Sequence, residues 1–302
     1  MISLRDVQKK FGKRLAVRDL SLAVPRREIF GLLGHNGAGK STAIGMMLGQ
    51  VWPTRGEVRL CGYDVTTHRA RALRRVGAIF ETPAFYDYLS GWRNLEVLSH
   101  YSAPTPPERI RQVVDWVGLT GRERSAVRTY SHGMRARLAI AQALLPEPEL
   151  LIFDEPGSGL DPEGIAEMRQ TIARLHRELG LTILLSSHLL SEVEQLCTRI
   201  AVLQQGRKVF EGRVADVRAA RGRLMLRTPD FAKAAALLRR RGIITGAEDG
   251  TAIQLSEGRA PAEAVKALVE SDIPVDGIWQ REQSLEDFYL DLVKAPPSTN
   301  PS

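Results

Sequence analysis

The sequence predicts an α/β protein in two parts, a large domain on a mixed sheet and a small C-terminal α/β domain. Three observations predict this class. Short apolar segments alternate with helical ones over the first 214 of the 302 residues. A strand–helix–strand run at 150–187 requires parallel pairing. Near residue 215 a second, shorter alternation begins. The composition, 43% hydrophobic and 25% charged, is that of a globular protein.

Local patterns justify the elements of the large domain in order. Residues 1–25 alternate apolar and polar positions, which predicts strands. The remaining expected strands are 29–33, 56–61, the end of 71–80, 150–154, 182–187 and a hairpin at 200–212 that turns at Gln205 and Gly206. Helices are expected after residue 42, within 90–145, from about 165 to 179, and at 191–199.

The small domain is expected to span 215–294. Its pattern predicts strands at 222–228 and 251–258 and helices at 231–242, 260–272 and 284–293. Residues 295–302, APPSTNPS, are expected to be a disordered tail. The domain boundaries are therefore placed at 214 and 294.

Charge and cysteine content narrow the function classes. The net charge of +7 belongs to residues 1–214, because basic and acidic side chains nearly balance beyond them. Nucleic acid, phosphate ligands and an anionic membrane surface all remain compatible with this excess. Cys61 and Cys197 are too few for a metal cluster and indicate a reducing compartment. No apolar run reaches about 18 residues and no secretory signal is visible, so we expect a cytoplasmic protein.

A glycine-rich segment between the strand at 29–33 and a helix predicts a phosphate-binding loop. It matches G-x-x-x-x-G-K-[ST], and its residues are Gly34, His35, Asn36, Gly37, Ala38, Gly39, Lys40 and Ser41. Its backbone amides would wrap the phosphates, with the His35 side chain pointing outward. Lys40 would reach the β- and γ-phosphates, Ser41 would bind Mg²⁺, and Thr42 would extend the cradle toward the α-phosphate. The sequence thus predicts a P-loop NTPase core.

Two adjacent acids end the apolar strand at 150–154. Asp154 would hold Mg²⁺ through water, and Glu155 would orient or deprotonate the attacking water. Taken alone, such a pair equally fits a solvated turn, but the phosphate loop favours the catalytic interpretation.

With these motifs, residues 1 to about 214 resemble the ATP-binding subunits of ABC transporters. Tyr130-Ser131-His132-Gly133-Met134 stands at the place of the family's signature segment, which begins a helix after a helical subdomain. The remaining matches are the D-loop at 158–161, a switch histidine at His188, and Phe11, where an aromatic ring stacks on adenine. Ordinary packing is the alternative for Phe11, and a strand-end histidine for His188.

The resemblance implies a head-to-tail pair of ATP-binding subunits. Each ATP, with Mg²⁺, would lie between one phosphate loop and the partner's Ser131 and Gly133. His188 would bind the γ-phosphate, and Asp161 would position the opposite site.

Two departures from the family pattern stand out. His132 and Met134 replace the usual Gly and Gln of the signature, which would tune or weaken activity. Glu81 replaces the Q-loop Gln; it could still bind the metal, and Glu at this place is similar to exporters of peptide antibiotics such as bacitracin and lantibiotics.

The resemblance implies an ATPase subunit of an exporter of antibiotic peptides, drugs or lipids. It would drive a separate membrane permease from the inner face of the membrane, as a homo- or heterodimer, with no nucleic acid as partner. The alternative is a soluble ABC ATPase acting on ribosomes or nucleic acid, but the chain has one nucleotide unit, no heptad run and no Cys cluster. A GTPase or kinase is disfavoured, because no Asn-Lys-x-Asp guanine motif occurs.

Overall fold

The computed structural model describes the chain except for residues 102–104, 220–222, 249, 282–283 and 295–302. The chain forms two compact units, Met1–Val214 and Ala215–Ser302. The expected disordered tail at 295–302 lies outside the described residues.

Two sheets organise the first unit. Among the described residues, one sheet has six strands in the order β10-β9-β3-β8-β7-β6, all parallel except the edge strand β10. Its strands are β3 (Ile29–Leu33), β6 (Val76–Ile79), β7 (Leu150–Asp154), β8 (Thr182–Ser187), β9 (Arg199–Gln204) and β10 (Arg207–Arg213). The other is antiparallel, in the order β2-β1-β4-β5, and consists of β1 (Ile2–Phe11), β2 (Arg14–Val24), β4 (Arg55–Leu60) and β5 (Tyr63–Asp64).

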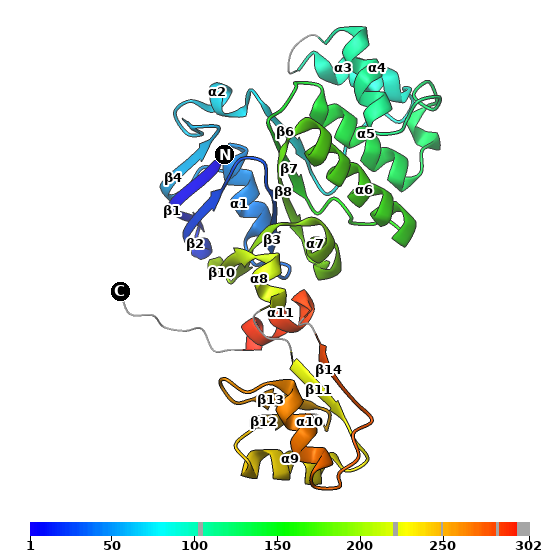
Figure 1. Cartoon of the computed structure of the whole chain (residues 1–302). Coiled ribbons are helices and arrows are strands. Elements are labelled where there is room, and N and C mark those ends of the chain that lie inside the picture. The colour runs from blue at the N-terminus through cyan, green and yellow to red at the C-terminus, as the bar shows by residue number, and fades with distance from the viewer. Residues whose placement is uncertain (102–104, 220–222, 249, 282–283, 295–302) are drawn as a thin grey trace. The chain divides into compact units, whose positions relative to one another are not determined.

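Helices flank these sheets, and those of residues 91–144 gather into the helical part expected around the signature segment (Figure 1). The helical part contains α3 (Gly91–Ser99), α4 (Pro107–Trp116), the 3₁₀ turn η1 (Val127–Thr129) and α5 (His132–Leu144). The other helices of this unit are α1 (Lys40–Met47), α2 (Arg69–Leu73), α6 (Pro162–Leu179) and α7 (Leu190–Leu196), and α8 (Val214–Ala219) begins at its last residue.

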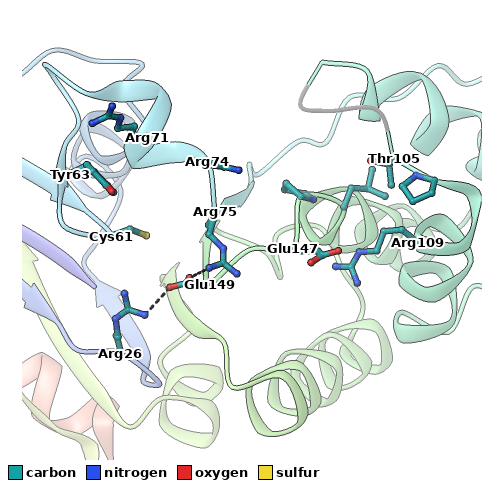
Figure 2. Close-up of a pocket in the computed structure, with 13 residues that line it drawn as sticks. Arg26, Cys61, Tyr63, Arg71, Arg74, Arg75, Thr105, Arg109, Glu147 and Glu149 are labelled. Carbon is teal, nitrogen blue, oxygen red and sulfur yellow. Dashed lines mark hydrogen bonds and ion pairs between the residues drawn. The ribbon is translucent and has the colours of Figure 1, made fainter.

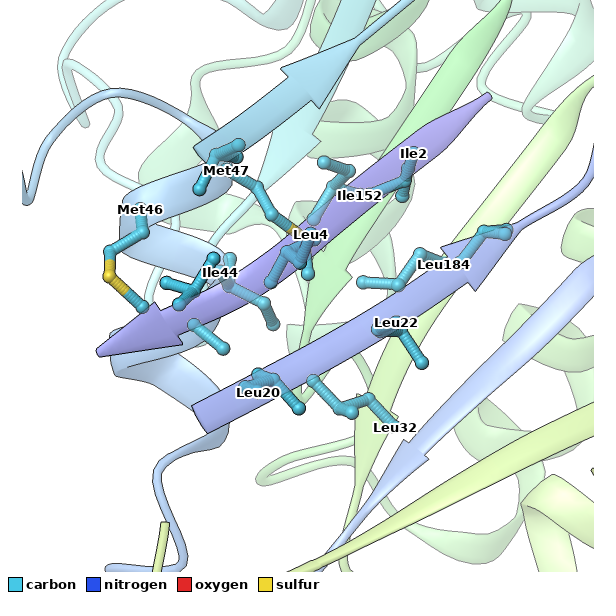
Figure 3. Close-up of a cluster of buried hydrophobic side chains, with 14 of the residues drawn as sticks. Ile2, Leu4, Leu20, Leu22, Leu32, Ile44, Met46, Met47, Ile152 and Leu184 are labelled. Carbon is cyan, nitrogen blue, oxygen red and sulfur yellow. The ribbon is translucent and has the colours of Figure 1, made fainter. Parts of the chain in front are cut away.

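From Ala43 to Met47, helix α1 is buried on every side, because it lies between the two sheets. Ile44 and Met47 pack in one cluster with side chains from β1 and β2 and from β3, β7 and β8 (Figure 3). Both side chains are at most 1% exposed. A helix that is buried all round is fixed by its neighbours. The first residue of α1, Lys40, is therefore held at a defined place.

The second unit is an antiparallel sheet covered by helices. The sheet order is β12-β13-β11-β14, with an apolar core that includes residues of α9 and α10. Its elements are β11 (Arg223–Arg227), α9 (Phe231–Arg240), β12 (Ile244–Glu248), β13 (Ala252–Leu255), α10 (Pro261–Val269), β14 (Gly277–Arg281) and α11 (Leu285–Lys294).

The structure adds two strands to those expected in the second unit. Strands β12 and β14, ITGAE and GIWQR, were not predicted, because neither contains the run of apolar residues that marks a strand in isolation. They form through pairing with β13 and β11. In the described part of the chain, no helix is long and apolar enough to span a membrane.

Candidate nucleotide site

Three neighbouring parallel strands deliver the predicted phosphate loop and acids to one edge of the six-stranded sheet. Strand β8 pairs with β3 on one side and with β7 on the other. The carboxyl ends of parallel strands meet at the same edge. The phosphate loop follows β3, Asp154 and Glu155 end β7, and His188 follows β8. The fold therefore brings these side chains together.

The phosphate loop has the backbone that a cradle requires. Gly34 and Gly39 have φ of 156° and 105°, and a Cβ on either would come within 2.8 Å of a backbone carbonyl oxygen, that of Leu203 or Ala16. Only glycine fits these two places without a clash. His35 is exposed, as are Asn36 and Gly37, while Ala38 is buried.

Lys40 is buried and its ammonium faces Glu155. The Nζ atom donates to the Gly34 carbonyl oxygen at 2.6 Å and lies 3.1 Å from Glu155 Oε1. His188 Nδ1 lies 2.7 Å from the other carboxylate oxygen, Glu155 Oε2. A lysine, a carboxylate and a histidine thus form one contiguous chain beside the loop.

Glu155 stands on a strained backbone. Its φ is 52°, in the left-handed region that non-glycine residues rarely adopt. Its amide donates to Ser186 Oγ at 3.0 Å, and that hydroxyl donates to Asp154 Oδ1 at 2.6 Å. Such outliers gather at functional sites, where the surroundings over-determine the backbone. Ser186 thereby fixes both acids.

Sequence reasoning missed Ser186. The available signal was polarity: Ser186 is fully buried and directly follows three apolar residues of its strand. Buried hydroxyls need hydrogen-bond partners. The strand neighbour of Ser186 is Asp154.

The surroundings of Glu155 set its ionisation. Burial raises the pKa of its carboxyl, but hydrogen bonds from His188 and Lys40 and the Lys40 charge outweigh burial, and the net pKa is lowered. Glu155 is therefore ionised at neutral pH, and the His188 ring donates its Nδ1 hydrogen to it.

A second glutamate, Glu192 on α7, lies near Glu155 and His188. Its Oε1 atom is buried without a hydrogen-bond partner in the described residues. Gly157 packs against its carboxylate so closely that a Cβ there would be 2.9 Å from Oε1. Burial raises the pKa of Glu192, and the Glu155 charge adds to this effect. The sequence analysis assigned Glu192 no role.

The predicted metal ligands lie on three segments. Ser41 is in the first turn of α1, beside Thr42, which was predicted to contact the nucleotide, and Asp154 is buried at the end of β7. Glu81 follows β6, and its Oε1 accepts a hydrogen bond from Ser158 Oγ at 3.2 Å. Within the described residues there is no group of three or more His, Cys, Asp and Glu that could hold a metal by itself. A hydroxyl and single carboxylates suit Mg²⁺, which is bound by one or two carboxylates together with substrate phosphates.

Other predicted residues lie away from the cradle. Ser131 caps α5, where its Oγ accepts from the Met134 amide at 3.2 Å, and Gly133 is in the first turn of that helix. Figure 1 shows α5 in the helical part, apart from α1. Asp161 caps α6 by accepting from the Gly164 amide at 2.9 Å.

Phe11 ends β1 and is 48% exposed. The Lys9 ammonium lies 4.8 Å from its ring centroid. The ring is therefore open to stacking.

Comparison with known proteins gives the family. The ABC transporter family profile matches residues 17–158. The chain is 38% identical to the uncharacterized ABC transporter ATP-binding protein YhcH of Bacillus subtilis strain 168, over 97% of this chain and 95% of that protein. It is also 38% identical to the bacitracin transport ATP-binding protein BcrA of Bacillus licheniformis, over 97% of each.

A solved structure supports the same family. An ATP-binding subunit of an ABC transporter matches with a TM-score of 0.64 and 30% identity, over 73% of this chain and 92% of that one. The P-loop NTPase fold, the ABC resemblance and the ATPase assignment made from the sequence are thereby confirmed. The protein belongs to the ABC transporter family, as one of its ATP-binding and ATP-hydrolysing subunits.

Proposed function

We propose that the chain drives export through a separate membrane permease, and that two ATP-binding subunits close around ATP and Mg²⁺. The observation that carries this proposal is the Lys40–Glu155–His188 chain beside the glycine cradle. The BcrA relative is named for bacitracin transport. An antibiotic peptide is therefore the favoured cargo, ahead of drugs and lipids.

The chemistry assigned to each residue follows from its position. The loop amides and Lys40 bind phosphate oxygens, so Lys40 leaves Glu155 for the substrate when ATP is bound. Ser41, Asp154 and Glu81 would hold Mg²⁺, which would neutralise charge on the phosphates. Glu155, held by Ser186 and His188, accepts a proton from the attacking water. His188 keeps its Nε2 atom for the γ-phosphate, because Nδ1 faces Glu155.

The exposed Ser131 segment supports pairing. Its hydroxyl and the amides of the first turn of α5 form a helix N-terminus of the kind that binds phosphate, yet they lie on a different part of the unit from the cradle. A second subunit would supply this segment to the loop. In the described residues, nothing indicates the alternative role on ribosomes or nucleic acid.

The test is export activity with a matched charge control. The chain is co-expressed with its proposed membrane permease, and bacitracin tolerance is measured together with ATP turnover of the purified complex. Lys40→Ala should abolish both, because the phosphates lose their buried cation. Lys233→Ala removes an exposed charge in the second unit and should change neither. Loss of such a contact usually lowers turnover far more than tenfold, so turnover above about a tenth of wild type in Lys40→Ala would contradict the assignment of this site.

The cargo is tested separately. Tolerance to bacitracin is compared with tolerance to an unrelated drug and to a lipid-like antibiotic. If only the last two rise with the chain and depend on Lys40, the exporter assignment stands and the peptide cargo is wrong.

A further inference from the structure

A large arginine-lined cavity lies at the opposite edge of the sheet from the phosphate loop. Its volume is about 770 Å³, and it is bordered by five arginines and two glutamates (Figure 2). Arg75 directly precedes β6 and Glu149 directly precedes β7. These positions are the amino ends of parallel strands whose carboxyl ends carry the nucleotide site. The cavity is thus separate from that site.

On one side of the cavity, a single carboxylate lies between two arginines. Glu149 pairs with Arg26 at 2.8 Å and also with Arg75. Figure 2 shows both pairs converging on the one carboxylate. A single glutamate therefore offsets only one of these two cations, and the pair of arginines keeps an excess positive charge.

The far side is held by Arg109 of α4. Its guanidinium donates to the Leu144 carbonyl oxygen at 2.5 Å and to Gln112 Oε1 at 2.6 Å, while its Nε is buried without a partner in the described residues. Burial lowers the pKa of Arg109, and the nearby Glu147 charge acts the other way. Fixed by these bonds, Arg109 is a preorganised cation.

Two arginines of the cavity have no ion-pair or side-chain hydrogen-bond partner among the described residues. Arg71 and Arg74, on and directly after α2, are exposed, and neither makes an ion pair or side-chain hydrogen bond with a described residue. Both line the cavity, and two guanidinium groups without a paired anion create a local positive potential. Tyr63, 44% exposed, adds an aromatic ring to the same wall.

The chemistry of these groups selects phosphate. A guanidinium group can donate two parallel hydrogen bonds to the oxygens of one phosphate, and these bonds are charge-assisted. The volume lies within the roughly 300–1,000 Å³ of small-molecule sites and far exceeds the need of a single phosphate. We propose that this cavity is a second anion site of the ATPase subunit, and that it takes a small soluble molecule with two or more phosphate groups. This inference goes beyond the proposed export function.

Binding of inorganic pyrophosphate tests the site. Because the phosphate loop also binds such anions, calorimetric titration is done on the full chain carrying Lys40→Ala. Adding Arg71→Ala and Arg74→Ala should weaken pyrophosphate binding at least about tenfold, the effect of losing one charge-assisted bond or more. Adding Arg5→Ala and Arg177→Ala instead removes the same charge from exposed positions that do not line the cavity and should leave the affinity unchanged.

With Lys40 intact, the Arg71→Ala, Arg74→Ala chain should bind a fluorescent ATP analogue as wild type does, which shows that it is folded. Equal pyrophosphate affinity in both triple variants overturns the proposal, and so does the absence of binding in Lys40→Ala alone.

Two further results would also overturn it. In the first, the chain binds phosphatidylglycerol vesicles in a way that depends on Arg71 and Arg74, and it does not bind pyrophosphate. The source of phosphate would then be a lipid headgroup. In the second, the Arg71→Ala, Arg74→Ala chain no longer co-purifies with the permease, and pyrophosphate binding is not observed. The cavity would then bind an acidic protein segment. None of these readouts depends on export, so the proposed function and this site fail separately.

Discussion

Glu155 contacts two side chains beside the phosphate cradle, Lys40 at 3.1 Å and His188 at 2.7 Å. Glu155→Gln keeps the size of the side chain and one of its two acceptor oxygens, and it removes the basicity. ATP binding should persist while hydrolysis falls about 10²–10⁴-fold, the usual contribution of a general base. Phosphate release and binding of a labelled ATP measure the two effects.

Asp154→Asn is the comparison for that variant. Because Asp154 is assigned to Mg²⁺, this change should raise the Mg²⁺ concentration needed for activity. Near wild-type hydrolysis by Glu155→Gln would remove Glu155 from the mechanism, and loss of ATP binding would make it a structural residue.

Glu192 should cost stability at neutral pH. Its folded pKa is raised, so the cost is absent below the unfolded pKa of about 4.3 and is complete once the pH exceeds the folded pKa. Glu192→Gln should therefore increase the free energy of unfolding at pH 7 by up to about 1 kcal/mol, the lower part of the range for an unsatisfied buried group. Urea unfolding between about pH 8 and pH 4 measures this difference, which should shrink as the pH falls. A difference independent of pH would mean that packing, and not charge, distinguishes the two side chains.

At the scale of elements, α1 links the two sheets to the phosphate loop. Met47 is fully buried in the cluster of Figure 3. Met47→Ala should lower the free energy of unfolding by about 2–5 kcal/mol, the range for such truncations in a core. Val209→Ala, at a 37% exposed position of β10, should change it by less than about 0.5 kcal/mol. Chemical denaturation compares both, and equal small effects would contradict the account of α1 as a core helix.

Elements that carry their own burial pattern could be predicted from the sequence. Strands β3, β7 and β8 are buried at every position, and their runs of apolar residues indicate this burial in the sequence. Helix α6 begins at Pro162, earlier than the expected residue 165, because Asp161 caps it and Pro fits the first turn. Strands β12 and β14 need partners to exist, and Ser186 gains its role only from a neighbour 32 residues away in sequence. Such information lies in pairing and not in local pattern.

For the whole molecule, the proposed pairing through the Ser131 segment predicts that the oligomeric state depends on nucleotide. The isolated chain should be a monomer without ATP. Glu155→Gln should form a long-lived dimer in Mg-ATP, because ATP bridges the two copies and is not hydrolysed. Sedimentation velocity distinguishes the two states. A stable dimer without nucleotide would contradict this prediction, and Lys40→Ala combined with Glu155→Gln, which should not hold ATP, serves as the monomer control.

The left-handed backbone at Glu155 affects which side chains are tolerated at this position. A side chain in that conformation costs about 1–2 kcal/mol that glycine does not. A library randomised at this one codon and sorted for soluble yield should enrich glycine and asparagine, whereas the same library sorted for transport should return glutamate. We therefore expect selection for turnover and selection for folding to rank the side chains at residue 155 in opposite order.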